Sequence, residues 1–207
     1  MDETPGRRTG KSRKYFLTFP YMAAKKSNAG ICTYCNATVA KRSNSIEKHL
    51  SECPEQLALA SKSPPRKCFL LMIQSENPAY WMLVKVTAET KLKELDSFLR
   101  AMWLECCGHL SEFSYDEPFT DTTIEMTKNL KSVFAQTNEF WYVYDFGSST
   151  NILIRLFGQG ELRKGENPIT ILMRNVAPET LCQHCHKPAG GICSKCQWES
   201  DTPFVCE

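Results

Sequence analysis

Two groups of closely spaced cysteine and histidine residues, one near each end of the chain, constrain its fold more than any other feature. Their members are Cys32, Cys35, His49 and Cys53 in the first group, and Cys182, Cys185, Cys193 and Cys196 in the second. Each group offers four thiolate or imidazole ligands in two close pairs, which fill the tetrahedral coordination of zinc and leave no position for water. The sequence therefore predicts two structural zinc ions and a protein that is not an enzyme.

The cysteine count also bears on the cellular compartment. The chain has 11 cysteines, an odd number, and their paired spacing favours metal binding in a reducing compartment over a disulfide framework. The first residues are charged and contain no apolar leader, and apolar runs such as residues 69–73 are too short to span a membrane. We therefore expect an intracellular protein, cytoplasmic or associated with the nucleoid or nucleus.

Charge is distributed unevenly along the chain. Residues 1–67 carry 13 Lys and Arg against 5 Asp and Glu, whereas residues 68–207 have a net charge of −6. A basic head on an acidic body indicates that the head binds a polyanion. The alternative is a solvated basic tail without a ligand.

The first group of ligands lies in a segment with the pattern of a small zinc finger. Residues 31–36 predict a strand and a tight turn, with Asn36 in the left-handed conformation. A helix is expected over residues 45–53, capped by Ser43 or Asn44. Bound metal would supply much of the folding free energy of a unit this small.

Residues 12–55 resemble the BED-type zinc finger of transposases and chromatin-associated proteins. The resemblance rests on an aromatic lead-in, the Cys-x-x-Cys pair and a helix in which Ile46 replaces the usual leucine before His49. It implies binding of double-stranded DNA, with the start of the helix in the major groove. The alternative is a finger that makes only protein contacts. The residues expected to contact bases or phosphates are Lys25, Lys26, Lys41, Arg42, Ser43, Asn44, Ser45 and Lys48.

The rest of the chain predicts an α+β protein with a linker between finger and body. Residues 1–55 form the tail and finger, and residues 56–67, with two adjacent prolines, predict an extended linker and a loosely tethered finger. Residues 68–178 predict a mixed sheet with one main helix, and residues 179–207 a zinc knuckle. In this body we expect strands over 68–74, 80–86, 109–115, 139–146, 151–157 and 169–176, helices over 90–104 and 128–134, and a turn at 158–160.

Residues 68–178 resemble the plasmid pRiA4b ORF-three-like family, a domain of unsettled function often associated with mobile elements. The most specific part of the match is the Tyr-Asp-Phe-Gly stretch that ends at Gly147. The polar residues that follow this stretch in the family are missing here. Asp145 is therefore expected to form a turn, and His109 to be a hydrogen-bonded structural residue.

The second group of ligands resembles the first half of a cross-brace zinc finger of the B-box or MYND type, which implies protein–protein contact. Gly190 and Gly191 allow the chain to reverse between the two cysteine pairs. The alternative is a knuckle that only closes the C-terminus. Whether Cys206, His184 or His186 also binds the metal stays open at this stage.

These observations predict a zinc protein that binds double-stranded DNA through its finger and is associated with a mobile element. The second hypothesis is an inhibitor or regulator that binds a protein partner through its acidic body. A nuclease or recombinase is the third, and it would require chemistry at Asp145 or His109. No membrane and no small-molecule substrate is expected as a partner.

Overall fold

The computed structural model describes residues 28–58, 66–104, 108–163, 165–176, 178–192 and 204–206. The chain divides into two compact units. One is Lys25–Pro178, and the other comprises Met1–Ala24 and Glu179–Glu207.

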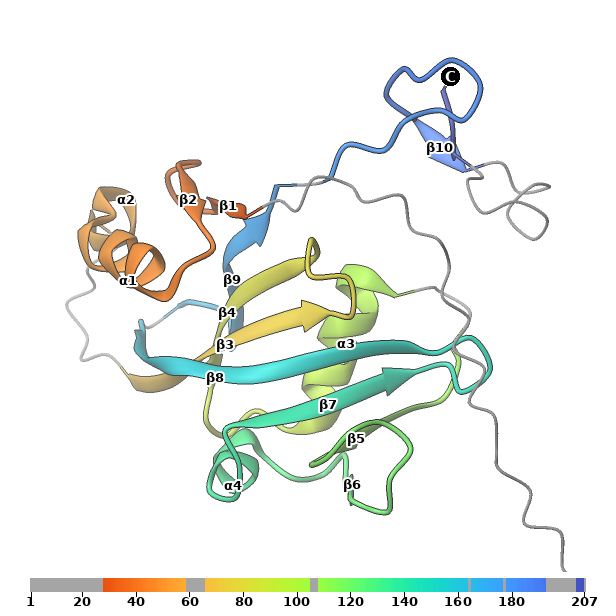
Figure 1. Cartoon of the computed structure of the whole chain (residues 1–207). Helices are drawn as coiled ribbons and strands as arrows, with labels where there is room; N and C mark the ends of the chain where they lie inside the picture. Colours follow the sequence, from red (N-terminus) through yellow and green to blue (C-terminus); the bar gives the residue numbers. More distant parts are fainter. Residues whose placement is uncertain are drawn as a thin grey trace, which may run out of the picture. The chain divides into compact units, whose positions relative to one another are not determined.

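The larger unit is built on a nine-stranded sheet with the order β2-β1-β9-β4-β3-β8-β7-β5-β6 (Figure 1). Every pair of neighbours in this order is antiparallel. The sheet therefore lacks the mixed strand directions that the sequence predicted. The strands are β1 Ala29–Cys32, β2 Thr38–Ala40, β3 Arg66–Ser75, β4 Trp81–Thr87, β5 Ser111–Ser114, β6 Thr123–Ile124, β7 Glu139–Tyr144, β8 Thr150–Leu162 and β9 Ile169–Asn175.

Helix α3, Leu92–Trp103, covers one face of this sheet (Figure 1), and the short helix α4, Leu130–Phe134, contributes Leu130 and Val133 to the same core. Leu92, Leu95 and Leu99 recur at helical spacing within the helix predicted over 90–104, and they are fully buried. They pack against alternate residues of the strands and form the main core. The α+β class is therefore confirmed, and the predicted helices and body strands are present with small shifts at their ends.

The finger covers part of the opposite face of the sheet. Its helices are α1, Ser43–Glu52, and α2, Pro54–Ala58. Val39 and Ile46 of the finger share a buried cluster with four residues of β4 and β9, namely Trp81, Leu83, Leu172 and Met173. Because side chains alternate between the faces of a strand, β4 is buried on both sides, by α3 and by the finger.

The expected loose tether between finger and body is wrong. Strand β1 pairs with β9, so the finger supplies two strands of the same sheet as the body. The predicted linker 56–67 is partly structured, because α2 extends to Ala58 and β3 begins at Arg66, and residues 59–65 lie outside the described part. Proline and polar composition indicated an extended segment there, but this pattern does not show how the flanking segments pack.

Two local predictions also need correction. The predicted turn at 158–160 lies inside β8, where Gly158 pairs with Leu70 and Gly160 with Cys68. A Cβ atom on Gly160 would lie 3.0 Å from Cδ2 of Leu70, which explains a glycine within a regular strand. Helix α1 begins at Ser43, and its N-cap is Arg42, which makes no side-chain capping bond.

The smaller unit has two short described strands, β10 Gly191–Ile192 and β11 Phe204–Val205, which pair antiparallel. Around them, the Gln183 N–H donates to the Phe204 carbonyl at 3.0 Å and the Gly190 N–H to the Val205 carbonyl at 3.0 Å.

In the described ranges, no helix is long and apolar enough to cross a membrane.

Candidate metal centres

The four predicted ligands of the finger converge. The ligand atoms of Cys32, Cys35, His49 and Cys53 all lie within 4.8 Å of one another, and Cys35 Sγ is 3.5 Å from His49 Nε2. Cys32 and Cys53 are buried, while Cys35 and His49 are partly exposed. Three thiols and one imidazole at this spacing match the tetrahedral ligand set of structural zinc. If all four residues bound one tetrahedral ion, they would fill its coordination positions.

The two Cys-x-x-Cys turns in the described part of the chain have the same backbone geometry. In the finger, the Asn36 N–H donates to the Cys32 carbonyl at 3.0 Å, and Asn36 has a φ of 59°. In the C-terminal unit, the His186 N–H donates to the Cys182 carbonyl at 3.0 Å, and His186 has a φ of 57°. The left-handed residue after the second cysteine reverses the chain in both turns, as predicted for Asn36.

The C-terminal cluster contains a ligand that the sequence left open. Cys182, Cys185 and Cys206 bring their sulfur atoms within 4.8 Å of one another, and Cys185 Sγ is 3.5 Å from Cys206 Sγ. Cys193 and Cys196, the other predicted ligands, lie outside the described residues. The pairing of β10 with β11 positions Cys206, which directly follows β11, and this long-range pairing could not be read from local spacing.

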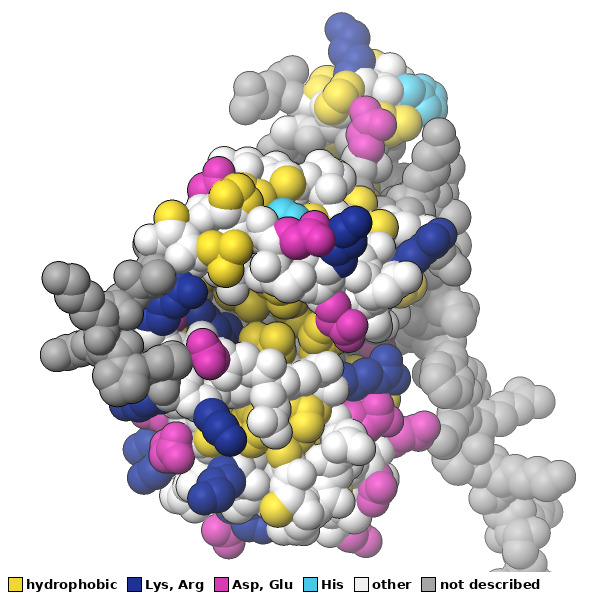
Figure 2. Space-filling view, turned by 90° about the vertical axis from the view of Figure 1, so that its left-hand side faces the viewer, with side chains coloured by type: hydrophobic (Ala, Val, Ile, Leu, Met, Phe, Trp, Pro, Cys, Tyr) yellow, Lys and Arg dark blue, Asp and Glu magenta, His cyan; other side chains and the backbone are white. Residues whose placement is uncertain are grey.

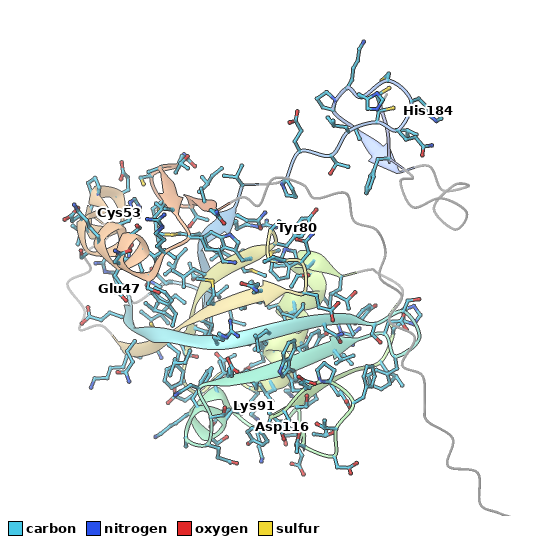
Figure 3. The ribbon with its side chains drawn as sticks, viewed as in Figure 1. Glu47, Cys53, Tyr80, Lys91, Asp116 and His184 are labelled. Atoms are coloured by element: carbon cyan, nitrogen blue, oxygen red, sulfur yellow. The ribbon has the colours of Figure 1, made fainter. Side chains whose placement is uncertain are left out.

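Backbone amides favour the thiolate form of Cys182, whereas Cys185 and Cys182 raise the pKa of Cys206 to about 11. N–H groups of Cys185, His184 and Cys206 donate to the Cys182 sulfur and lower the pKa of its thiol to about 6. Thiolate, not thiol, is the metal ligand, so this turn is prepared for a cation. His184 and His186 are both exposed, and His184 is labelled in Figure 3.

A buried ion pair anchors the finger to the sheet. Lys85 of β4 donates to Glu166 Oε1 at 2.7 Å, and the side chains are 4% and 17% exposed. Tyr34 of the finger donates to the same oxygen at 3.3 Å, and the Arg163 N–H donates to Glu166 Oε2 at 2.5 Å. Burial alone would raise the pKa of Glu166, but the Arg163 amide and the Lys85 ammonium outweigh it and lower the pKa. Burial, together with Glu166, raises the pKa of Tyr34 to about 12.

Three further side chains, Thr33, Lys41 and Arg163, fix the finger to the body. Thr33 Oγ1 donates to the Ile171 carbonyl of β9 at 2.7 Å. Lys41 Nζ donates to Gln74 Oε1 at 2.7 Å and lies 5.5 Å from the centre of the Trp81 ring. The Arg163 guanidinium donates to the Gln56 carbonyl of α2. These contacts connect both ends of the finger to strands of the body.

The predicted DNA-binding residues divide into two sets. Arg42, Ser43, Asn44 and Lys48 are exposed on helix α1 or at its start, and Ser45 is half-buried. Lys41 is directed into the body by its bonds to Gln74 and the Pro78 carbonyl, which sequence spacing did not reveal. Lys25 and Lys26 lie outside the described residues.

A groove runs between helix α1 and strand β8. Two cavities of about 460 Å³ and 340 Å³ share Phe157, and both are bounded by α1 residues at helical spacing. Figure 2 shows this side of the molecule hollowed, with hydrophobic side chains in the hollow. Glu47, labelled in Figure 3, borders the larger cavity.

A polar network joins helix α3 to strands β5 and β7. Asp96 accepts hydrogen bonds from Tyr142 and Ser111, both at 2.7 Å, and forms a salt bridge with Arg100 at 2.9 Å. Its carboxylate is thereby saturated, which indicates a structural role.

The two residues named for the enzyme hypothesis lie beside this network. Asp145 Oδ1 accepts the Gly147 N–H at 2.9 Å, which confirms the predicted turn. The His109 N–H donates to the Tyr144 hydroxyl at 3.2 Å, and its ring nitrogen is 3.8 Å from Asp145. The neighbouring Cys106 and Cys107 lie outside the described residues.

Comparison with known proteins adds a structural likeness. No protein-family model and no curated protein matches the chain. A crystal structure of a protein of unknown function from Methanosarcina mazei Go1 is similar, with 20% identity and a TM-score of 0.44. The match covers 56% of this chain and 71% of that chain.

Proposed function

We propose that the protein is a zinc-dependent, non-enzymatic DNA-binding protein in which the finger carries the nucleic-acid interface. The observation behind the proposal is the convergence of Cys32, Cys35, His49 and Cys53, two of which lie at the C-terminal end of helix α1, whose exposed start carries Arg42. Zinc is proposed as the metal because three thiols and an imidazole within 4.8 Å suit its coordination. A second ion is proposed at the C-terminal cysteines.

The start of helix α1 is the part of the finger that suits a phosphate backbone. Its apolar face, with Ile46 and Leu50, packs against the body, so the opposite face is free for a ligand. Arg42, at the N-cap, and Lys48 are exposed and supply positive charge, and the exposed Ser43 and Asn44 supply hydrogen-bonding groups. The helix has ten residues and no side-chain cap, so its first N–H groups can donate to a phosphate. The resemblance to BED-type fingers supports the same interface.

A salt titration with matched variants tests this proposal. Binding of a fluorescently labelled DNA duplex by the zinc-loaded chain is measured by anisotropy at increasing salt. Each lost phosphate contact reduces the slope of log K against log salt by about 1, so Arg42→Gln and Lys48→Gln should each give this change. Lys93→Gln, an exposed lysine of α3, is the matched control and should leave the slope unchanged. Absence of duplex binding by the folded, zinc-loaded chain would refute the proposal.

The second candidate function is binding of a protein partner through the acidic body, which has a net charge of −6 over residues 68–207. Deleting the finger cannot separate the two functions, because β1 and β2 belong to the sheet of the body. The point variants Arg42→Gln and Lys48→Gln do separate them. If the biological activity of the protein survives both substitutions, that activity belongs to the acidic body.

A further inference from the structure

Three large apolar side chains are exposed together at one end of the sheet. Leu110 is 73% exposed, Phe119 58% and Phe146 44%. The rings of Phe119 and Phe146 meet edge to face, with centroids 5.9 Å apart. Leu110 is joined to the segment before Phe146 by the Asp145 N–H, which donates to the Leu110 carbonyl at 2.9 Å. We call these three residues the aromatic end patch.

The loop that carries Phe119 is held in shape by its own hydrogen bonds. Ser114 Oγ donates to the Asp116 carbonyl at 2.9 Å, and the Asp116 N–H donates to Thr122 Oγ1 at 3.2 Å. Thr120 Oγ1 donates to the Glu117 carbonyl at 3.0 Å. Within this loop Phe119 has a φ of 64°, which is unfavourable for a bulky residue. The fold therefore keeps this ring in solvent at a conformational cost.

The surroundings of the patch are acidic. Residues 108–123 and 145–149 contain no Lys or Arg, and they carry the five carboxylates Glu112, Asp116, Glu117, Asp121 and Asp145. Asp116, Glu117 and Asp121 are exposed, and Asp116 is labelled in Figure 3. Of the nearby cations, Arg100 is bound to Asp96, and Lys128 lies over the Tyr115 ring at 5.7 Å. A polyanion would be repelled here, whereas a cation would be attracted.

We infer that the aromatic end patch binds a protein segment in which Lys or Arg side chains flank a large apolar side chain. The apolar side chain packs on the Phe119 and Phe146 rings, which are otherwise left in water. The basic side chains pair with the carboxylates of Asp116, Glu117 and Asp121 and stack on the aromatic rings. This inference concerns the body and is independent of DNA binding by the finger.

Two synthetic peptides and four variants test the inference on the full, zinc-loaded chain. One fluorescein-labelled peptide alternates arginine with leucine, and the matched peptide alternates arginine with serine. The leucine peptide should bind more tightly, because only it supplies an apolar anchor. Truncation of an aromatic anchor costs about tenfold or more in affinity, so Phe119→Ser should weaken the leucine peptide by this factor.

The remaining variants separate the apolar and charged contributions. Asp116→Asn combined with Asp121→Asn should weaken binding and reduce its salt dependence. Leu57→Ser removes an equally large exposed side chain, 50% exposed on α2, and should leave the affinity unchanged. If Phe119→Ser reduces the zinc content of the protein, Phe146→Ser takes its place as the test variant. The same loss of affinity for the leucine peptide is expected.

Three results would overturn the inference. Equal affinity for the two peptides would show attraction by charge alone. Peptide binding that is undetectable, or unchanged in Phe119→Ser and Phe146→Ser, would show that the patch is not the site. Self-association of the wild type in sedimentation, abolished by Phe119→Ser, would show that a second copy of the chain covers the patch.

Discussion

A Cβ atom placed on Gly30 would lie 2.5 Å from Cη2 of Trp81, so strand β1 of the finger and the side chain from β4 of the body pack in direct contact. The same hypothetical atom would lie 2.8 Å from the Arg174 carbonyl oxygen of β9. No side chain fits at this position, because one obstacle is a fully buried indole and the other is backbone. The finger is thus part of the core of the larger unit.

Substitution of Gly30 should destabilise the whole larger unit. Overpacking a close-packed interior costs about 1 to 3 kcal/mol, and we expect Gly30→Ala to lower the free energy of unfolding by this amount. Urea unfolding followed by intrinsic tryptophan fluorescence measures the change. The control is Gly158→Ala, because a Cβ there has no atom within 4 Å. Equal stability of the two variants would show that β1 does not pack against Trp81 as described.

The ion pair between Lys85 and Glu166 should contribute strongly to stability. Glu166→Gln leaves the Lys85 ammonium buried without its counter-ion, which costs about 2 to 4 kcal/mol. Glu139→Gln is the matched control, since its salt bridge to Arg155 is half exposed on both sides and contributes at most about 1 kcal/mol. Urea unfolding of both variants at neutral pH, with zinc in excess, gives the comparison.

The loss of unfolding free energy in Glu166→Gln should depend on pH, because the pKa of Glu166 is lowered in the folded protein. A carboxyl whose pKa is lower in the folded state stabilises the protein fully above its unfolded pKa. That contribution is lost as the pH falls through the folded value. The deficit of Glu166→Gln should therefore be constant from neutral pH down to about 5 and shrink below about 4. A deficit that grows with acidification would contradict the assigned role.

Metal content should report the two clusters separately. Native mass spectrometry of protein purified without chelator should show two zinc ions per chain. Cys206→Ser should lose one ion, because this sulfur lies 3.5 Å from Cys185 Sγ. Cys68→Ala should keep both ions, since Cys68 is a buried residue of β3 outside both groups. Retention of both ions by Cys206→Ser would exclude Cys206 as a ligand.

Periodicity and spacing predicted much of this architecture. The main helix was predicted over 90–104, and Leu92, Leu95 and Leu99 recur at helical spacing along its buried face. The spacing of the four finger ligands identified the residues whose atoms converge within 4.8 Å. Both signals come from residues spaced a few positions apart. Helix and turn geometry places such residues on one side of the chain.

The parts that the sequence did not reveal depend on contacts between distant segments. Nothing near Thr33 or Ile46 indicates that the finger packs on β4 and β9, because an apolar helix face does not identify its partner. Cys206 and Lys41 are similar cases. The first is placed by the pairing of β10 with β11, and the second is drawn into the body by Gln74 and Trp81.

Amide hydrogen exchange before and after chelation tests most directly whether the metal centre of the finger is part of the core of the body. Removing the metal should release α1 and β1, so protection should fall in β9 and β4 as well as in the finger, while α3 keeps more of its protection. His49→Ala should reproduce this pattern without chelator. Loss of protection confined to residues 28–58, or no change on chelation, would contradict the account.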